Sequence, residues 1–182
     1  KLLESNDRQR GLALLKIAVD VAPNLSAARN NLAVALLRLN RGDEAVPHLQ
    51  AAIASDPKFA DPRVNLARFL ITKQRHQEAL ALIDPILQRA YHPGAVRVKA
   101  QVLVAQKRIP ELSAVFETMV KHEPKDPSAW MNLGKLQLQV SGAVPALDSF
   151  EQAAKLAPGN AEIQSTVTRL RQQLAKDGQK RP

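Results

Sequence analysis

Histidine is the residue of this chain best suited to acid–base catalysis or metal binding, and its four copies are isolated. His48, His76, His92 and His122 lie far apart in the sequence, with no second ligand at metal-site spacing. The absence of cysteine excludes disulfides and thiolate metal sites. The sequence has no glycine-rich phosphate loop, no G-x-S-x-G elbow and no carboxylates clustered on one helical face. We therefore expect no enzymatic activity, no catalytic residues, no metal and no cofactor.

Recurrent asparagines offer a different chemistry, that of peptide binding. Asn31 and Asn65 are 34 residues apart, and Asn132 follows after about two further intervals of that length. An amide side chain both donates and accepts hydrogen bonds, so it matches the alternating N–H and C=O groups of a peptide backbone. Asparagines placed one repeat apart could hold an extended peptide whatever its side chains. The alternative is that asparagine is simply common before the leucine of each repeat, where its side chain forms hydrogen bonds within the protein's own groove and not with a ligand.

The elements that carry these asparagines belong to a repeat of about 34 residues. One set of small and apolar residues, with a final proline, recurs with identical spacing: Leu32, Ala33, Leu36, Ala45, Leu49, Ala52 and Pro57 against Leu133, Gly134, Gln137, Ala146, Phe150, Ala153 and Pro158. A unit of this length cannot bury its apolar face alone and must stack on copies of itself. We expect a single solenoid over 1–182, with the end of a truncated repeat at 1–25, repeats at 26–59, 60–92, 93–126 and 127–160, a capping helix at 161–176 and a disordered tail at 177–182.

Each copy predicts two helices, because its apolar residues recur at helical spacing in two blocks. In the first complete copy, we expect Gly42 to adopt the left-handed conformation that ends the first helix and Asp43 to cap the second. Asp126 followed by Pro127 predicts a capped helix start. The fold class is therefore all-α.

This pattern resembles the tetratricopeptide repeat family. Residues 127–160 match its signature best, while Arg29 replaces a large apolar residue, and Lys99 and Leu112 stand where Leu and Ala are usual. The resemblance implies a right-handed α-solenoid of antiparallel helix pairs, whose first helices line a concave groove.

The resemblance also implies which residues face that groove. They are polar or basic side chains of the first helices: Asn30, Asn31, Arg38, Asn65, Arg68, Arg97, Gln101, Asn132 and Lys135. Asn31, Asn65 and Asn132 resemble the asparagine ladder in the repeats of O-linked N-acetylglucosamine transferases, and Val98 interrupts it. The basic members would favour an acidic segment or a terminal carboxylate. The carboxylate clamp of chaperone-binding members is incomplete, because Ala27, Asp61 and Gly94 occupy positions where it needs basic residues.

The net charge of +9 does not indicate nucleic-acid binding, because it is spread evenly: +2 over 1–59, +4 over 60–126 and +3 over 127–182. No apolar run has the roughly 18–20 residues that span a bilayer.

These features predict a scaffold that binds a protein or peptide segment in its groove, within a bacterial multiprotein assembly. The chain begins at Lys1 rather than methionine, so we expect it to come from a longer protein. The alternative is a non-catalytic arm of a larger enzyme or of a polysaccharide or pilus secretion machine. The bacterial periplasm or cell envelope and the cytoplasm all fit the composition.

Overall fold

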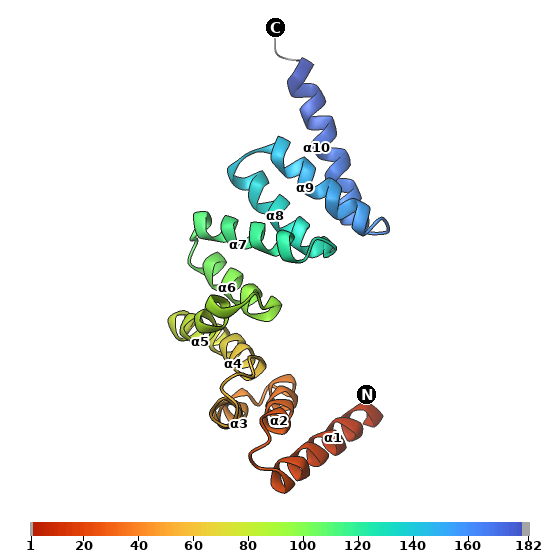
Figure 1. Cartoon of the computed structure of the whole chain (residues 1–182). Coiled ribbons are helices and arrows are strands. Elements are labelled where there is room, and N and C mark those ends of the chain that lie inside the picture. The colour runs from red at the N-terminus through yellow and green to blue at the C-terminus, as the bar shows by residue number, and fades with distance from the viewer. Residues whose placement is uncertain (1, 180–182) are drawn as a thin grey trace. The chain divides into compact units, whose positions relative to one another are not determined.

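The computed structural model describes residues 2–179, with side chains described for residue 7 and for residues 9–177. Within that range every regular element is a helix, ten in all (Figure 1). They are α1 (Leu2–Val21), α2 (Ser26–Arg38), α3 (Gly42–Ser55), α4 (Asp61–Thr72), α5 (His76–Arg89), α6 (Pro93–Ala105), α7 (Ile109–His122), α8 (Pro127–Val140), α9 (Ala143–Leu156) and α10 (Ala161–Gln179). The chain is all-α, as predicted. The segment expected to be a disordered tail begins inside α10, and residues 180–182 lie outside the described range.

The helices form two compact units, residues 1–102 and 103–182. In the first unit α2 packs against α3 and α4 against α5, and α2 also contacts α4. Ala33 of α2, Ala45 of α3, Ala67 of α4 and Ala79 of α5 are all fully buried. Small side chains at these positions allow the paired helices to approach closely, and larger apolar residues such as Leu36, Leu49 and Ile83 fill the core around them.

In the second unit α8 packs against both α7 and α9, and α9 packs against α10. A Cβ added to Gly134 of α8 would lie 3.0 Å from the ring of Phe150 in α9, so only glycine permits this helix approach without a shift. Val167 and Leu170 of α10 are buried against the same cluster as Phe150. Most of the other described residues of α10 are exposed.

The turn between the two helices of a pair is formed differently from the sequence-based expectation. Asn40, not Gly42, has the left-handed backbone conformation, with φ of 58°. Gly42 instead begins α3, so Asp43 lies inside the first turn and does not cap the helix. The physical reason for glycine at this point is space, because a Cβ on Gly42 would overlap the ring of Phe69 in α4.

The same turn recurs after α4 and α6. Gln74 and Lys107 also have positive φ, of 60° and 55°. In each case the next residue donates its backbone N–H to a carbonyl five residues earlier, at distances of 2.9–3.0 Å: Arg41 to Leu36, Arg75 to Leu70 and Arg108 to Leu103. This is the Schellman closure of a helix C-terminus. The arginine side chain then binds a glutamate in the following helix, as in the Arg41–Glu44 pair at 2.6 Å.

A second recurrent contact joins α2, α4, α8 and α10 to the turns before them. A side-chain N–H near the start of the helix donates to a proline carbonyl six residues earlier: Arg29 to Pro23, Arg63 to Pro57, Trp130 to Pro124 and Gln164 to Pro158. Arg29, which departs from the apolar residue usual at its position, therefore keeps a structural role as a donor.

Candidate functional site

The polar stripe predicted from the sequence is present on the first helices of the first unit. Asn31, Val34 and Arg38 follow one another at helical spacing along α2, and Asn65 and Arg68 continue the surface on α4. The two helices contact each other, so their stripes lie side by side. Asn31, Arg38 and Arg68 are exposed, whereas Val34 and Asn65 are half-buried.

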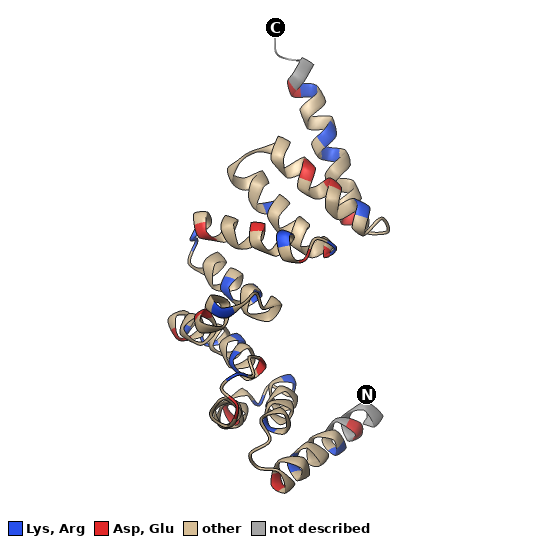
Figure 2. Ribbon diagram, in the orientation of Figure 1, with Lys and Arg blue, Asp and Glu red and all other residues tan. Residues whose placement is uncertain are grey.

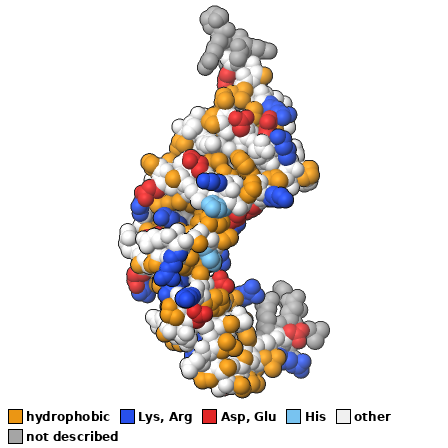
Figure 3. All heavy atoms as spheres, in the orientation of Figure 1, with side chains coloured by type: hydrophobic (Ala, Val, Ile, Leu, Met, Phe, Trp, Pro, Cys, Tyr) orange, Lys and Arg blue, Asp and Glu red, His pale blue; other side chains and the backbone are white. Residues whose placement is uncertain are grey.

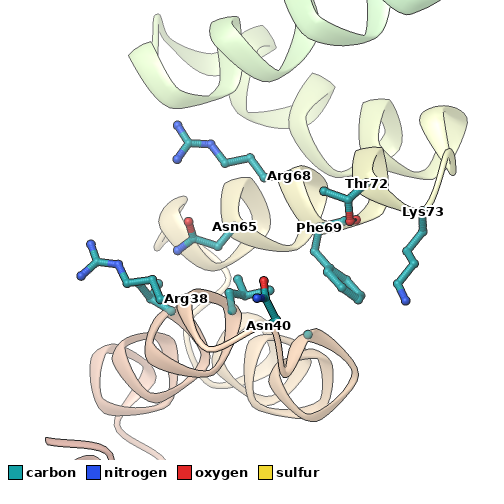
Figure 4. A pocket seen from close by; sticks show the side chains of 10 residues that line it. Arg38, Asn40, Asn65, Arg68, Phe69, Thr72 and Lys73 are labelled. Atoms are coloured by element: carbon teal, nitrogen blue, oxygen red, sulfur yellow. The ribbon is translucent and has the colours of Figure 1, made fainter. Parts of the chain in front are cut away.

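An open pocket of about 660 Å³ lies between α2 and α4. The guanidinium groups of Arg38 and Arg68 extend to the same side of it, with the amide of Asn65 between them (Figure 4). The ring of Phe69 and the side chain of Lys73 lie at the other end of the pocket (Figure 4). The pocket therefore combines two guanidinium groups, an amide and an aromatic ring.

A second open pocket, of about 740 Å³, lies between α1 and α2. Its lining is mainly aliphatic: Gly11, Leu12, Leu15, Val34, Ala35 and Leu39, together with Asn31 and Arg38. Val34 and Arg38 line both pockets. The two pockets are consequently neighbours on one surface, which we call the α1–α2–α4 groove.

Arg38 and Arg68 have no hydrogen-bond or ion-pair partner among the described residues, whereas Lys73 does. Its Nζ lies 3.5 Å from Asp43 Oδ1 and 5.2 Å from the centre of the Phe69 ring. Basic and acidic residues are distributed along the described helices (Figure 2), and their side chains are interspersed on the face shown in Figure 3. Arg38 and Arg68 thus give the groove a local positive charge that no ion pair offsets, and the described residues that line the two pockets include no acidic side chain.

Asn30 does not present its amide to a partner, although the resemblance placed it among the groove residues. It is only 7% exposed, and its Oδ1 accepts a hydrogen bond of 2.9 Å from Nδ2 of Asn65. This bond links α2 to α4 and orients Asn65. The Oδ1 and the second N–H of Asn65 remain available to a ligand.

The other predicted residues lie on α6 and α8. Gln101 is exposed and Arg97 half-buried on α6, while Val98, which interrupts the asparagine series, is fully buried and cannot reach a ligand. In the second unit Asn132 is half-buried, and Lys135 pairs at 3.3 Å with Glu162 of α10. The structure therefore brings together Asn31, Arg38, Asn65 and Arg68 in the groove of the first unit.

Sequence reasoning missed the apolar part of this groove. Leu37 of α2 and Phe69 of α4 were not among the predicted groove residues, and Leu12 and Leu15 belong to the segment that the sequence predicted only as the end of a truncated repeat. Their exposure to the pockets depends on how α1, α2 and α4 pack against one another, which the apolar spacing of the sequence does not specify.

Among the described residues no group of three or more His, Asp or Glu side chains could hold a metal ion. None of the described helices is both long and apolar enough to cross a membrane.

Comparison with known families agrees with this architecture. Residues 2–60 and residues 41–102 each match a model of the tetratricopeptide repeat, so the matches run together from residue 2 to residue 102. The chain belongs to the tetratricopeptide repeat family. As a tetratricopeptide repeat (TPR) protein with paired helices, it is a protein-interaction module.

Curated relatives share the repeats over part of their length. The chain is 32% identical over 90 residues to tetratricopeptide repeat protein 33 of Xenopus laevis, covering 49% of this chain and 35% of the relative. It is 27% identical to cellulose synthase 2 operon protein C of Komagataeibacter xylinus, covering 86% of this chain and 14% of the relative. The chain thus spans about a third or less of the length of these two relatives.

Solved structures share the fold at low identity. PilF of Pseudomonas aeruginosa matches with a TM-score of 0.73 and 21% identity, covering 96% of this chain and 86% of PilF. YrrB, described as a TPR protein with an unusual peptide-binding site, matches with a TM-score of 0.68 and 17% identity, covering 86% of this chain and 81% of YrrB.

Proposed function

We propose that this TPR module binds an extended segment of a partner protein in the α1–α2–α4 groove. The observation that carries the proposal is that Asn31, Arg38 and Arg68 are exposed without a partner among the described residues, and that Asn65 keeps a free Oδ1 and one free N–H, around two adjacent open pockets. Asn31 and Asn65 supply amide donors and acceptors for a peptide backbone, in the manner of the ladder in O-linked N-acetylglucosamine transferases. The peptide-binding site of YrrB, a TPR protein of similar fold, supports this class of ligand.

Asn132, the third asparagine of the predicted ladder, belongs to the second unit. It is half-buried on α8, next to the exposed Lys135. We propose that Arg97 and Gln101 on α6, and separately Asn132 and Lys135 within the second unit, bind partner groups by the same chemistry. The bond between Asn30 and Asn65 gives the ladder a fixed starting geometry, because it holds the Asn65 amide in one orientation.

A blocking substitution tests the proposal without altering charge. Val34 lines both pockets, so Val34→Trp should fill the groove, whereas Ala54→Trp adds the same side chain to an exposed position of α3. Peptides are selected from a random displayed library on the wild-type protein, and their affinities are measured by fluorescence anisotropy. We expect V34W to weaken binding by at least about tenfold and A54W to leave it unchanged. Equal binding by wild type and V34W would reject this groove as the site.

A second candidate role is that of a non-catalytic arm in a larger polysaccharide or pilus secretion machine. The alignment with cellulose synthase 2 operon protein C favours it, because most of this chain matches a small part of that long protein. The fold shared with PilF is compatible with either role. Affinity purification of the natural full-length protein, followed by identification of bound components, tests this role. Recovery without any export or pilus component would reject it.

A further inference from the structure

The α1–α2–α4 groove has two chemically different halves. One half is the pocket with the unpaired Arg38 and Arg68, and the other is the aliphatic pocket lined by Leu12, Leu15 and Leu39. Arg38 and Val34 form the border between them. A ligand that lies along the groove must therefore place an anionic group at the cationic pocket and an apolar group at the adjacent aliphatic pocket.

The cationic half is suited to a carboxylate. Arginine presents planar N–H donors that bind a carboxylate in a bidentate manner. Arg38 and Arg68 lie on neighbouring helices and extend to the same side of the pocket (Figure 4). They repel each other when the site is empty, and a single anion between them is attracted by both. Asn65 between them adds an amide donor, because only one of its two N–H groups is used by Asn30.

Alternate side chains of an extended segment point to the same side and are about 7 Å apart. This spacing suits two adjacent pockets that share lining residues. We propose that the groove selects segments in which an aspartate or glutamate lies two residues from a large aliphatic or aromatic side chain. The acidic side chain binds Arg38 and Arg68, and the apolar side chain enters the pocket between α1 and α2. The inference rests on the proposed function and specifies the partner's chemistry.

The test compares two double variants with the same loss of charge. Arg38→Gln with Arg68→Gln removes the cationic site, and Lys58→Gln with Arg89→Gln removes two exposed charges of the same unit outside the groove. The probes are peptides selected from a random displayed library on the wild-type protein, each paired with a copy carrying Gln for Glu or Asn for Asp. Affinities are measured at ionic strengths of about 0.01 M and about 0.15 M.

We expect the selected peptides to carry an acidic residue two positions from Leu, Ile, Val, Met or Phe. Loss of the carboxylate should weaken binding to the wild type about tenfold at low ionic strength, and less at the higher one. The preference should vanish in R38Q/R68Q and persist in K58Q/R89Q. Circular dichroism establishes that both variants are folded, which we expect because all four side chains are exposed.

Two results would overturn the inference. In the first, the peptides with Gln for Glu or Asn for Asp bind the wild type as tightly as the acidic peptides do. If V34W still abolishes that binding, the proposed function stands and only the selectivity for acidic residues fails. In the second, K58Q/R89Q loses the preference as fully as R38Q/R68Q, which would show a response to net charge alone. If no selected peptide depends on Val34, the proposed function itself fails.

Discussion

The side-chain amide of Asn65 donates a hydrogen bond of 2.9 Å to Oδ1 of Asn30, and so connects α4 to α2 beneath the groove. Asn30 is nearly buried and Asn65 half-buried, so the bond is partly shielded from water. One asparagine of each helix is consequently structural, while the neighbouring Asn31 stays exposed. Two adjacent asparagines of the same helix thus have different roles.

This relationship predicts different costs for neighbouring substitutions. Asn65→Ala leaves the buried Oδ1 of Asn30 without a donor and should reduce the free energy of unfolding by about 1–3 kcal/mol. Asn31→Ala should change it by less than about 0.5 kcal/mol. The N30A/N65A double variant should lose less than the sum of its two single variants, because they break one bond. Urea unfolding measures the stability of N30A, N31A, N65A and N30A/N65A. Strictly additive losses for N30A and N65A would contradict the proposed hydrogen bond between the two side chains.

Gly42 and Gly11 should respond to alanine in opposite ways. A Cβ on Gly42 overlaps the Phe69 ring, so Gly42→Ala should destabilise the protein by about 1–3 kcal/mol. Gly11 lies within α1 with open space at its Cβ position, so Gly11→Ala should stabilise by about 0.5–1 kcal/mol. Thermal unfolding followed by circular dichroism separates the two. A smaller loss for G42A in a Phe69→Leu background would identify the ring as the cause.

His48 of α3 should make stability depend on pH. Its Nδ1 is buried without a hydrogen-bond partner among the described residues. Burial, and then the positive charges of Arg29 and Lys16, lower the pKa of His48, while Glu44 opposes them. The unfolded chain therefore binds this proton more readily, and the free energy of unfolding should fall as pH decreases below about 6.5.

His48→Gln should flatten this part of the stability curve, whereas His122→Gln, an exposed substitution in α7, should preserve it. Urea midpoints measured between neutral and mildly acidic pH provide the comparison. Parallel curves for wild type and H48Q would show that another group is responsible.

The left-handed turn residues offer a stabilising substitution. Gln74 has φ of 60°, a conformation that costs a residue with a side chain about 1–2 kcal/mol relative to glycine. Gln74→Gly should therefore raise the free energy of unfolding by about 0.5–1 kcal/mol after the greater entropy of the unfolded glycine is included. Gln50→Gly, in the middle of α3, should lower it by a similar amount. Equal effects of both substitutions on the free energy of unfolding would show that the positive φ of Gln74 does not cause the stabilisation.

The helices, their pairing and the family could be predicted from the sequence, because apolar spacing and small residues determine them locally. Asp126 caps α8 as expected, accepting a hydrogen bond of 2.9 Å from the Ser128 N–H. Gly42 could not be interpreted correctly, because its neighbour Phe69 lies 27 residues away in the sequence and meets it only after α4 packs.

The groove was predicted only in part for the same reason. Exposure of Arg38 and Arg68 follows from helical periodicity, but their lack of acidic partners depends on how neighbouring helices pack. The bond that removes Asn30 from the groove surface joins residues 35 positions apart. The donor role of Arg29 could have been found, because Arg29, Arg63, Trp130 and Gln164 each follow a proline by six residues and each carries a side-chain N–H.

The starts of α2, α4, α8 and α10 use three residue types, arginine, tryptophan and glutamine, to reach the backbone carbonyl of a preceding proline. The contact therefore requires only a side-chain N–H within reach of that carbonyl, and neither charge nor aromatic character. Mutation among these residue types can alter the surface of a repeat while the geometry of its helix start is preserved.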